Sequence, residues 1–482
     1  MLQSKDINKI CELKNGFTHS WLEPEFILSS LKCFSFSKLC GCISQVKLRG
    51  YSFESVFTIL ISLPFIGAAS VHSMVNGAVK YHVESGKDTF YRLKNNPVIC
   101  WRLILWLFAA KFKKLTETGS SNGQQIRCMV FDDTVIVKTG KFIEKVSRVW
   151  DHVSNGYRIG FKLLLMGYWD GTSFIPLDFS YHRERGKNKE KPFGLKKKEL
   201  KKQYKKKREP GSFNYERAVE ADMSKIDIAI KMFKRAISQG FIVDYVLMDS
   251  WFTCGAFINA VLSVKKQTVH LIGMYKIAKT KFRYSGGLYT YSQIRNMLGK
   301  ARRCRKLGFY YKEAIVFFGD KELKLFFSKQ GKNGKWKVFV CTDTRLTFIK
   351  MIEIYQTRWS IEVFFKEAKQ LLDLGKCQSN DFDAQIADAT ITMVQHILLT
   401  CKFRYENYES KPGMFALIKE QATLQRLNQR LWGLFLQIVR AVADIFEDID
   451  QEQLFEKIMQ DEQVYKKISR LFDNEEGIRK AA

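Results

Sequence analysis

The order of strand-like and helix-like segments between residues 127 and 277 constrains the fold of this chain more than any other feature. Three strand-like segments come first, CMVFDDTVIV, YRIGFKLLLMGYW and TSFIPLDFSYHRE, and Asp170-Gly171 between the last two is a hairpin turn signal. A helical segment closed by Gly240, the short apolar strand VLMDS, a second helical segment and the strand TVHLIGMYKI then alternate. Successive strands predict antiparallel pairing, and strands separated by helices predict parallel pairing. We therefore expect a mixed sheet covered by helices on both faces.

A second β-rich region precedes the last helix of this part. Residues 278–335 carry short alternating strands with Gly turns, KVFVCTDT adds one more strand, and one long helix is predicted over residues 347–372. With residues 278–335 taken as an insertion, the order is strand, strand, strand, helix, strand, helix, strand, helix, as in the ribonuclease-H-like fold. The predicted class is α/β: a ribonuclease-H-like mixed sheet with a β-rich insertion, flanked by N-terminal and C-terminal helical regions.

A chain of 482 residues exceeds what one core usually holds, so several domains are expected. We predict a helical, DNA-binding region over residues 1–120, a catalytic domain over 121–277 and 336–400, the insertion over 278–335, and a C-terminal helical region over 401–482. Around Asn95-Asn96-Pro97, two short helices form either a helix-turn-helix DNA reader or an ordinary helical hairpin. The most apolar run, residues 56–71, contains Pro64 and is shorter than the ~20 residues that span a bilayer, so we expect a buried helix pair and no membrane partner.

The charge balance favours a polyanionic partner. Lys and Arg number 79 against 49 Asp and Glu, a formal net charge of +30, which repels itself unless partly neutralised. Nucleic acid is the leading partner, although ribosomal and membrane-surface proteins share this balance. Residues 183–208 hold fourteen Lys or Arg and three Glu, and are either a phosphate-neutralising loop or a solvated loop without a dedicated role. Eleven Cys without a CxxC pair, and no secretory signal, predict reduced thiols and a cytoplasmic location.

Three carboxylates on separate elements are candidates for phosphodiester chemistry. Asp132 is expected to end the first strand, Asp249 to end a later one, and Glu362 to lie on the long helix. They are 117 (249 − 132) and 113 (362 − 249) residues apart, so only the fold can join them. Cutting a phosphodiester, and attacking a second one with the freed 3′ hydroxyl, needs an activated nucleophile and a stabilised leaving oxygen, which two Mg²⁺ ions provide. Since Mg²⁺ takes hard oxygen ligands, these three residues are the candidate catalytic and metal-binding set.

The predicted long helix carries four polar residues on one stripe. At 100° per residue, Tyr355, Arg358, Glu362 and Lys369 fall within about 60° of one another, beside an apolar face that would bury the helix. A Glu flanked by these three donors suits phosphate binding near a metal, which makes Tyr355, Arg358 and Lys369 DNA-binding candidates. The alternative is a surface helix on which Arg358 and Glu362 form an ordinary ion pair.

The spacing Y-x2-R-x3-E-x6-K, within YQTRWSIEVFFKEAK, resembles the signature of a large group of bacterial insertion-sequence transposases of the DDE type. FDDT at residues 131–134 is similar to the first-carboxylate motif of that family, D-x-T after a strand, and VLMDS is similar to the second. The resemblance covers about residues 85–400, including the β-rich insertion. It leaves the first ligand open: the D-x-T spacing favours Asp132, whereas adjacency to Thr134 favours Asp133.

The resemblance implies a DNA transposase that cuts transposon ends and joins the 3′ hydroxyl to target DNA. It implies two Mg²⁺ ions with Mn²⁺ as a substitute, double-stranded DNA (terminal inverted repeats and target) as partner, a homodimer in the synaptic complex, and a nucleoid-associated location in a bacterial cytoplasm. The alternatives are a metal-dependent nuclease of the same fold, an inactive transposase-derived DNA-binding protein, and a basic RNA-binding protein. The intact carboxylates and the complete four-residue signature argue against the last two.

Overall fold

The computed structural model describes residues 25–41, 43, 50–76, 85–117, 125–276 and 280–423, with isolated positions between 457 and 467. The chain divides into two compact units. One comprises Met1–Ser29, Thr58–Lys87 and Gly413–Ala482, and the other comprises Ser30–Phe57 and Asp88–Pro412. All the candidate site residues lie in the second unit. Most of the predicted C-terminal helical region lies outside the described residues.

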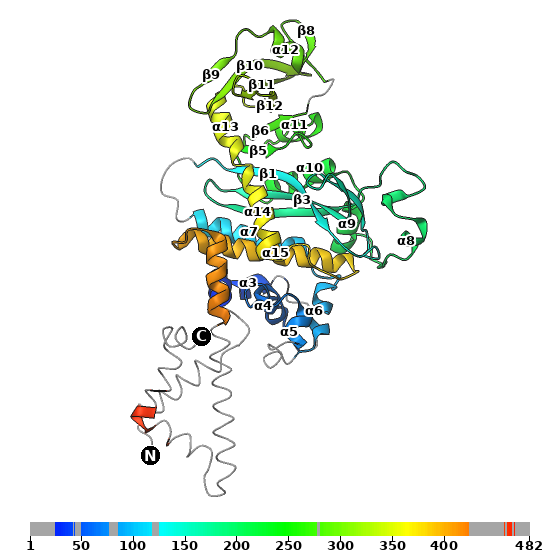
Figure 1. Cartoon of the computed structure of the whole chain (residues 1–482), viewed down its shortest axis with the longest axis vertical. Helices are drawn as coiled ribbons and strands as arrows, with labels where there is room; N and C mark the ends of the chain where they lie inside the picture. Colours follow the sequence, from blue (N-terminus) through cyan, green and yellow to red (C-terminus); the bar gives the residue numbers. More distant parts are fainter. Residues whose placement is uncertain are drawn as a thin grey trace. The chain divides into compact units, whose positions relative to one another are not determined.

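Twelve strands of the described residues form one mixed sheet (Figure 1). The strands are β1 (Cys128–Val137), β2 (Ser147–Asp151), β3 (Gly156–Trp169), β4 (Phe174–His182), β5 (Tyr245–Met248), β6 (His270–Tyr275), β7 (Lys281–Tyr284), β8 (Gly287–Thr290), β9 (Arg302–Cys304), β10 (Phe309–Phe318), β11 (Lys321–Gln330) and β12 (Lys337–Cys341). Their order is β2-β3-β1-β5-β6-β12-β11-β10-β7-β8, with β4 on β3 and β9 on β10. β1, β3 and β4 pair antiparallel, and β1, β5 and β6 pair parallel. The predicted mixed sheet is confirmed.

The hairpin between β3 and β4 follows the predicted turn. Gly171 has a φ of 104°, which favours glycine, and the Asp170 carboxylate accepts hydrogen bonds from the backbone N–H groups of Thr172 and Ser173 at 3.0 and 2.8 Å. Two features of the sheet were not predicted. β2 is a short strand paired with β3, and β12 joins the β-rich strands to the central ones by pairing antiparallel with both β11 and β6. The β-rich strands therefore extend the same sheet.

Helices cover both faces of the central strands. The helices of the described residues are α2 (Glu25–Cys33), α3 (Phe36–Gly41), α4 (Phe53–Ser62), α5 (Val71–Asn76), α6 (Lys87–Lys94), α7 (Trp101–Glu117), α8 (Lys197–Lys201), α9 (Phe213–Glu220), α10 (Lys225–Ser238), α11 (Gly255–Leu262), α12 (Tyr291–Met297), α13 (Phe348–Gln356), α14 (Trp359–Leu371) and α15 (Phe382–Tyr405), with a 3-10 turn at Pro192–Gly194. α10 and α11 pack on one face, and α7, α14 and α15 pack on the other (Figure 1). The expected covering of both faces is present.

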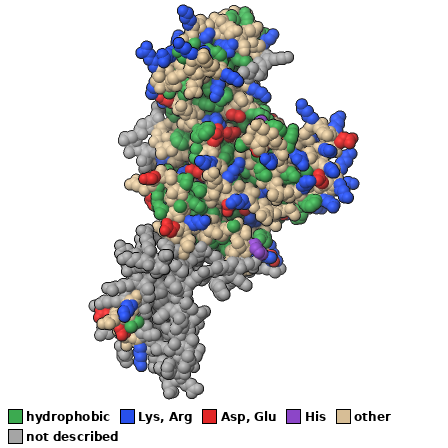
Figure 2. Space-filling view, viewed as in Figure 1, with side chains coloured by type: hydrophobic (Ala, Val, Ile, Leu, Met, Phe, Trp, Pro, Cys, Tyr) green, Lys and Arg blue, Asp and Glu red, His purple; other side chains and the backbone are tan. Residues whose placement is uncertain are grey.

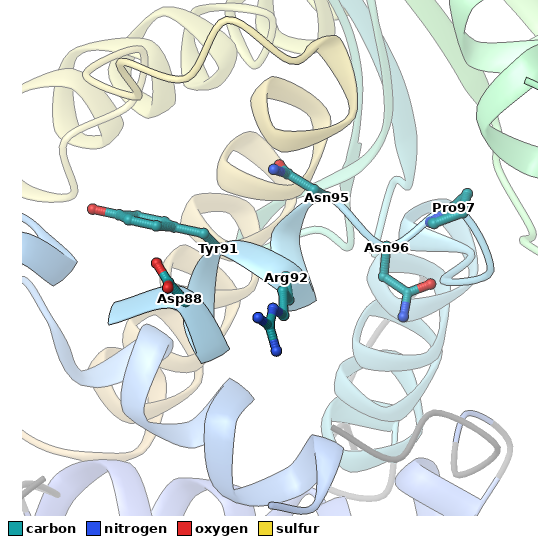
Figure 3. Close-up of a pocket in the computed structure, with 6 residues that line it drawn as sticks. All are labelled: Asp88, Tyr91, Arg92, Asn95, Asn96 and Pro97. Atoms are coloured by element: carbon teal, nitrogen blue, oxygen red, sulfur yellow. The ribbon is translucent and has the colours of Figure 1, made fainter. Parts of the chain in front are cut away.

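The helix pair around Asn95-Asn96-Pro97 packs as a hairpin. Trp101, Ile104 and Phe108 of α7 are buried, and α7 packs against β4 and α15. A recognition helix needs a free face to enter the major groove, so this packing favours the ordinary hairpin over the DNA reader. The turn leaves a hollow on the surface, lined by residues of α6 and of the turn itself: Asp88, Tyr91, Arg92, Asn95, Asn96 and Pro97 (Figure 3).

The apolar run over residues 56–71 is mostly buried, as predicted, but the predicted helix pair is wrong, because α4 ends at Ser62 and turns follow until α5 begins at Val71. Val56, Phe57 and Leu60 of α4 are at most 1% exposed, and Phe65 in the following turn is fully buried. None of the described helices combines the length and the apolar character needed to cross a membrane.

The predicted single helix over residues 347–372 is wrong, because two helices occupy this range. α13 ends at Gln356 and α14 begins at Trp359. At the break the Thr357 hydroxyl donates to the Ile354 carbonyl oxygen at 2.8 Å, a side-chain bond that competes with the helical ladder. Arg358 keeps helical backbone angles (φ −54°, ψ −32°), so the chain continues from one helix into the next.

Acid should weaken the packing of α15 against α14. His396 is 1% exposed, its ring centroid lies 4.7 Å from that of Phe364, and its Nε2 lies 3.0 Å from Glu367 Oε2. Burial, and then the charge of Lys411, lower the pKa of His396 to about 4. The folded protein therefore favours the neutral form of His396. Since the pKa of an unfolded histidine is about 6.5, the contribution of neutral His396 to stability is complete above about pH 6.5 and is lost as the pH falls towards 4. The thermal unfolding midpoint should fall over that interval more steeply for the wild type than for His396→Gln, and equal slopes would contradict the expectation.

Candidate active site

Asp132 and Asp249 occupy neighbouring positions next to the paired strands β1 and β5. The expected place of Asp132 at the end of its strand is wrong, because β1 continues to Val137, whereas Asp249 directly follows β5. β1 and β5 pair with Phe131 opposite Met248, so Asp132 and Asp249 are the next residue on each strand. The Asp132 side chain is 19% exposed. Burial raises the pKa of Asp132, Arg358 opposes the rise and the charge of Asp249 adds to it, so that the pKa reaches about 7. Two carboxylates in one poorly solvated place favour a cation beside them.

The loop after β5 fixes Asp249. The Asp249 carboxylate accepts hydrogen bonds from the N–H groups of Trp251 at 2.9 Å and Phe252 at 3.2 Å, and the Thr253 hydroxyl donates to the Asp249 carbonyl oxygen at 2.7 Å. The Thr253 side chain has room for this contact because the residue next to it on β6 is Gly273, which has no Cβ. A Cβ added to Gly273 would lie 2.2 Å from the Thr253 hydroxyl oxygen. The glycine therefore leaves room for the Thr253 side chain that holds the backbone of Asp249.

The variant Gly273→Ala should displace this loop. We expect overpacking to lower the free energy of unfolding by about 1–3 kcal/mol and to reduce DNA cleavage together with it. Thermal unfolding and a cleavage assay of the same preparation measure the two effects. Gly299→Ala is the matched control, because an added Cβ there meets nothing within 4 Å. Wild-type behaviour of Gly273→Ala in both assays would contradict the positioning role.

Arg358 joins two of the three carboxylates. Its Nη1 donates to Asp132 Oδ2 at 2.9 Å, and its Nη2 donates to Glu362 Oε1. The Arg358 side chain is 14% exposed and that of Glu362 is 34% exposed. Arg358 and Glu362 therefore form the ion pair expected for residues four apart on a helix. It is not an isolated surface pair, because Arg358 also contacts Asp132, 226 residues away in sequence.

Tyr355 and Lys369 also reach β5 and β1, respectively. The Tyr355 hydroxyl donates to the carbonyl oxygen of Met248, at 3.2 Å, and Lys369 Nζ donates to the hydroxyl of Thr134 at 2.7 Å and to the carbonyl oxygen of Val135 at 3.1 Å. The structure thus brings all six predicted residues to one place. Tyr355 and Lys369 here contact protein atoms, and their binding of DNA remains a prediction.

Comparison with known families decides what kind of domain holds this site. Residues 168–394 match the family model of the transposase DDE domain. The chain carries a transposase DDE domain. The match includes Asp249 and Glu362, and it begins 36 residues (168 − 132) after Asp132. A comparison with curated proteins gives no match. The predicted family is confirmed, and a transposase-type function follows from it.

The opposite face of β1 holds Asp133, the other candidate for the first carboxylate. Lys225 Nζ donates to Asp133 Oδ2, and Lys162 Nζ lies 3.5 Å from Asp133 Oδ1. Lys225 also lies 4.0 Å from the ring of Trp251, which is 47% exposed. Sequence reasoning missed these two lysines and the Trp, although the position of Trp251 two residues after Asp249 was a signal. The contacts support Asp132, because it is the neighbour that shares a face with Arg358.

Exchange of each aspartate for asparagine separates the two candidates. Asp132→Asn should lose DNA cleavage while keeping its thermal unfolding midpoint within a few degrees. Asp133→Asn should keep cleavage but unfold at a lower temperature, because the 5% exposed Lys162 loses its charged partner. A cleavage assay at a temperature where both variants are folded makes the comparison. Loss of cleavage in Asp133→Asn alone would reverse the assignment.

The three candidate carboxylates fit a divalent cation in the chemistry of their donors. Carboxylate oxygens are the ligands that Mg²⁺ prefers, and transposases of this family generally use divalent metals. Among the residues that the structure describes, however, no group of three or more His, Cys, Asp or Glu is arranged to hold a metal ion. Arg358 instead supplies positive charge to Asp132 and Glu362. Use of all three carboxylates as ligands requires Arg358 to release at least one of them.

Proposed function

We propose that this protein is a DNA transposase with a ribonuclease-H-like catalytic core, which cuts transposon ends and joins the freed 3′ hydroxyl to target DNA. The strand order β4-β3-β1-β5-β6, with antiparallel pairs followed by parallel ones, supports this core. The β-rich strands inserted between β6 and α13 support it as well. The family match supports the transposase class of reaction.

The observation that carries the proposal is that Asp132 and Asp249 occupy neighbouring positions of the sheet and that α14 reaches the first of them. Asp132 and Asp249 extend from β1 and β5, and Glu362 on α14 is linked to Asp132 through Arg358. In the proposal these three carboxylates hold two Mg²⁺ ions, or Mn²⁺ as a substitute. When bound, such ions would activate the attacking oxygen and stabilise the leaving one.

The polar stripe then binds the DNA phosphates. Arg358 has a planar guanidinium suited to bidentate contact with phosphate, and it already spans two anionic groups in the structure. Neutralisation of the carboxylates would free its donors for the phosphate beside the scissile bond. Tyr355 and Lys369 lie on the same side of the site and would contact adjoining phosphates.

A strand-transfer assay tests the function. The protein is incubated in Mg²⁺ with a labelled duplex that ends in the inverted repeat flanking its gene, together with an unlabelled target plasmid. Label joined covalently to the plasmid is the expected result. Hydrolysis without joining would make the protein a nuclease of the same fold. Selective binding of the repeat without cleavage would make it an inactive DNA-binding relative, and preference for RNA would contradict the proposal altogether.

The proposal includes pairing of two ends by two copies of the chain. Size-exclusion chromatography with light scattering, in the presence of the terminal repeats, should therefore give a complex of two chains and two duplexes. A complex of one chain with one duplex that still transfers strands would remove the homodimer from the proposal and leave the chemistry intact.

A further inference from the structure

The lysine-rich segment between β4 and α9 displays an unusual concentration of unneutralised charge. We call residues 185–207 the basic arm. Glu190 is the only exposed acid in it, against eleven exposed cations. These are Arg185, Lys187, Lys189, Lys191, Lys196, Lys197, Lys198, Lys201, Lys202, Lys205 and Lys207. In Figure 2 blue side chains gather over the part of the molecule that carries α8 in Figure 1.

A buried charge cluster fixes one end of the basic arm. Arg208 is 4% exposed; it donates to both oxygens of Glu144 at 2.7 Å and to Asp383 at 2.9 Å. Lys206 lies 2.8 Å from Asp383 and donates to the carbonyl oxygen of Asn95 at 2.7 Å, beside the hollow of Figure 3. These two cations are neutralised inside the protein. They therefore anchor the arm, whereas the other eleven cations are exposed to solvent.

Packing contacts hold the rest of the basic arm in place. The Arg183 guanidinium lies 3.9 Å from the ring of Phe193, and Leu195 is 1% exposed. Glu199 on α8 forms an ion pair with Lys141 at 2.7 Å. A flexible solvated loop would make none of these contacts. The arm therefore holds its cations close together on a built surface, where their mutual repulsion favours binding of a polyanion.

The surrounding surface indicates which polyanion. Cationic segments that enter a membrane surface carry exposed aromatic and aliphatic side chains beside their charges, and Tyr204 is the only large exposed one in the arm. Contacts with duplex phosphates need only the cations. Resting on the proposed function, we propose that the basic arm binds the sugar-phosphate backbone of duplex DNA, independently of base sequence, at a surface distinct from the six active-site residues.

The salt dependence of binding tests this proposal with the full-length protein. The affinity for a random-sequence duplex is measured between 50 and 300 mM salt without divalent ions, for the wild type and for the fourfold variant with Lys187, Lys189, Lys197 and Lys201 changed to Gln. If each lysine contacts one phosphate, the slope of log K against log salt should fall by roughly 3.6 (4 × 0.9), with affinity at least about tenfold weaker at 0.1 M salt.

Two matched variants control for charge. The same four positions changed to Arg keep the charge and should keep the slope. A second fourfold variant, with the exposed Lys231, Lys234, Lys265 and Lys266 changed to Gln, loses the same net charge elsewhere and should change the slope by less than about 1. Equal losses in the two Gln variants would overturn the proposal, because binding would then follow net charge alone.

Two further measurements identify the partner and separate this proposal from the proposed function. Tighter, arm-dependent binding of RNA or of vesicles containing anionic lipid, compared with duplex DNA, would overturn the assignment to DNA. A wild type that binds duplex through the arm but neither cuts nor joins DNA would remove the proposed function and leave the arm's binding supported. A wild type that transfers strands, with an unchanged slope in the arm variant, would overturn the arm alone.

Discussion

Replacement of Asp249 by Asn or of Glu362 by Gln should each lower the rate of donor-end cleavage in Mg²⁺ by about 10³-fold or more, which corresponds to about 4 kcal/mol of activation free energy. Each change keeps the size of the side chain and removes one carboxylate from the site where β5 and α14 meet β1. A neutral amide is a poor ligand for Mg²⁺ and cannot replace the lost charge. Single-turnover cleavage of a labelled transposon end measures the effect.

The matched control is Glu353→Gln on α13. The Glu353 side chain is 40% exposed and pairs with Lys306 and Lys350 at the surface, so its loss should leave cleavage within about twofold. All variants should bind the terminal repeat and unfold near the wild-type temperature. Cleavage by Asp249→Asn or Glu362→Gln within about tenfold of the wild type, in folded and DNA-bound protein, would remove that residue from the site.

Asp178→Asn should cause the largest loss of stability. Asp178 on β4 is 1% exposed and lies 3.1 Å from Arg102, 2.7 Å from Arg235 and 3.8 Å from Arg217. Burial opposes its charge, but the three guanidinium groups hold its pKa below the usual value. The variant leaves Glu220 as the remaining carboxylate of the cluster. Loss of one partner of such a buried cluster costs about 3–5 kcal/mol, to be measured by urea unfolding at pH 7.

The control for this loss is Asp320→Asn at an exposed position between β10 and β11, which should change stability by less than about 0.5 kcal/mol. Because the folded pKa of Asp178 is depressed, its contribution is present above the unfolded pKa of about 3.9 and is lost at lower pH. The difference between the wild type and Asp178→Asn should therefore shrink in acid. A difference below about 1 kcal/mol at pH 7 would contradict the stabilising role of the cluster.

Local patterns predicted those parts of the fold that depend on neighbouring residues. Strand alternation and the Asp170-Gly171 turn predicted β1, β3 and β4, because the side chains that face the core recur along each strand. The spacing of Tyr355, Arg358, Glu362 and Lys369 predicted one contact surface, and all four reach β1, β5 or each other. The break at Thr357 did not disturb this, because Arg358 keeps helical angles.

Long-range contacts could not be predicted from these patterns. The choice between Asp132 and Asp133 depends on which face of β1 meets α14, and adjacent strand residues point to opposite faces. The charge cluster of Arg208, Glu144 and Asp383 joins residues 64 and 175 positions apart in sequence. In the sequence, Arg208 is one more cation in a basic run, and only the fold distinguishes this anchor from its exposed neighbours.

Direct ligation of a metal by Asp249 is tested most sharply by the variant Asp249→Cys. A thiolate is a poor ligand for Mg²⁺ and a better one for the softer Mn²⁺. Strand transfer by Asp249→Cys should therefore be lost in Mg²⁺ and partly recovered in Mn²⁺, whereas Asp249→Ala should be inactive in both ions. Equal activity of Asp249→Cys in Mg²⁺ and Mn²⁺, or recovery of Asp249→Ala to the same extent, would contradict a metal-binding role for the carboxylate at the end of β5.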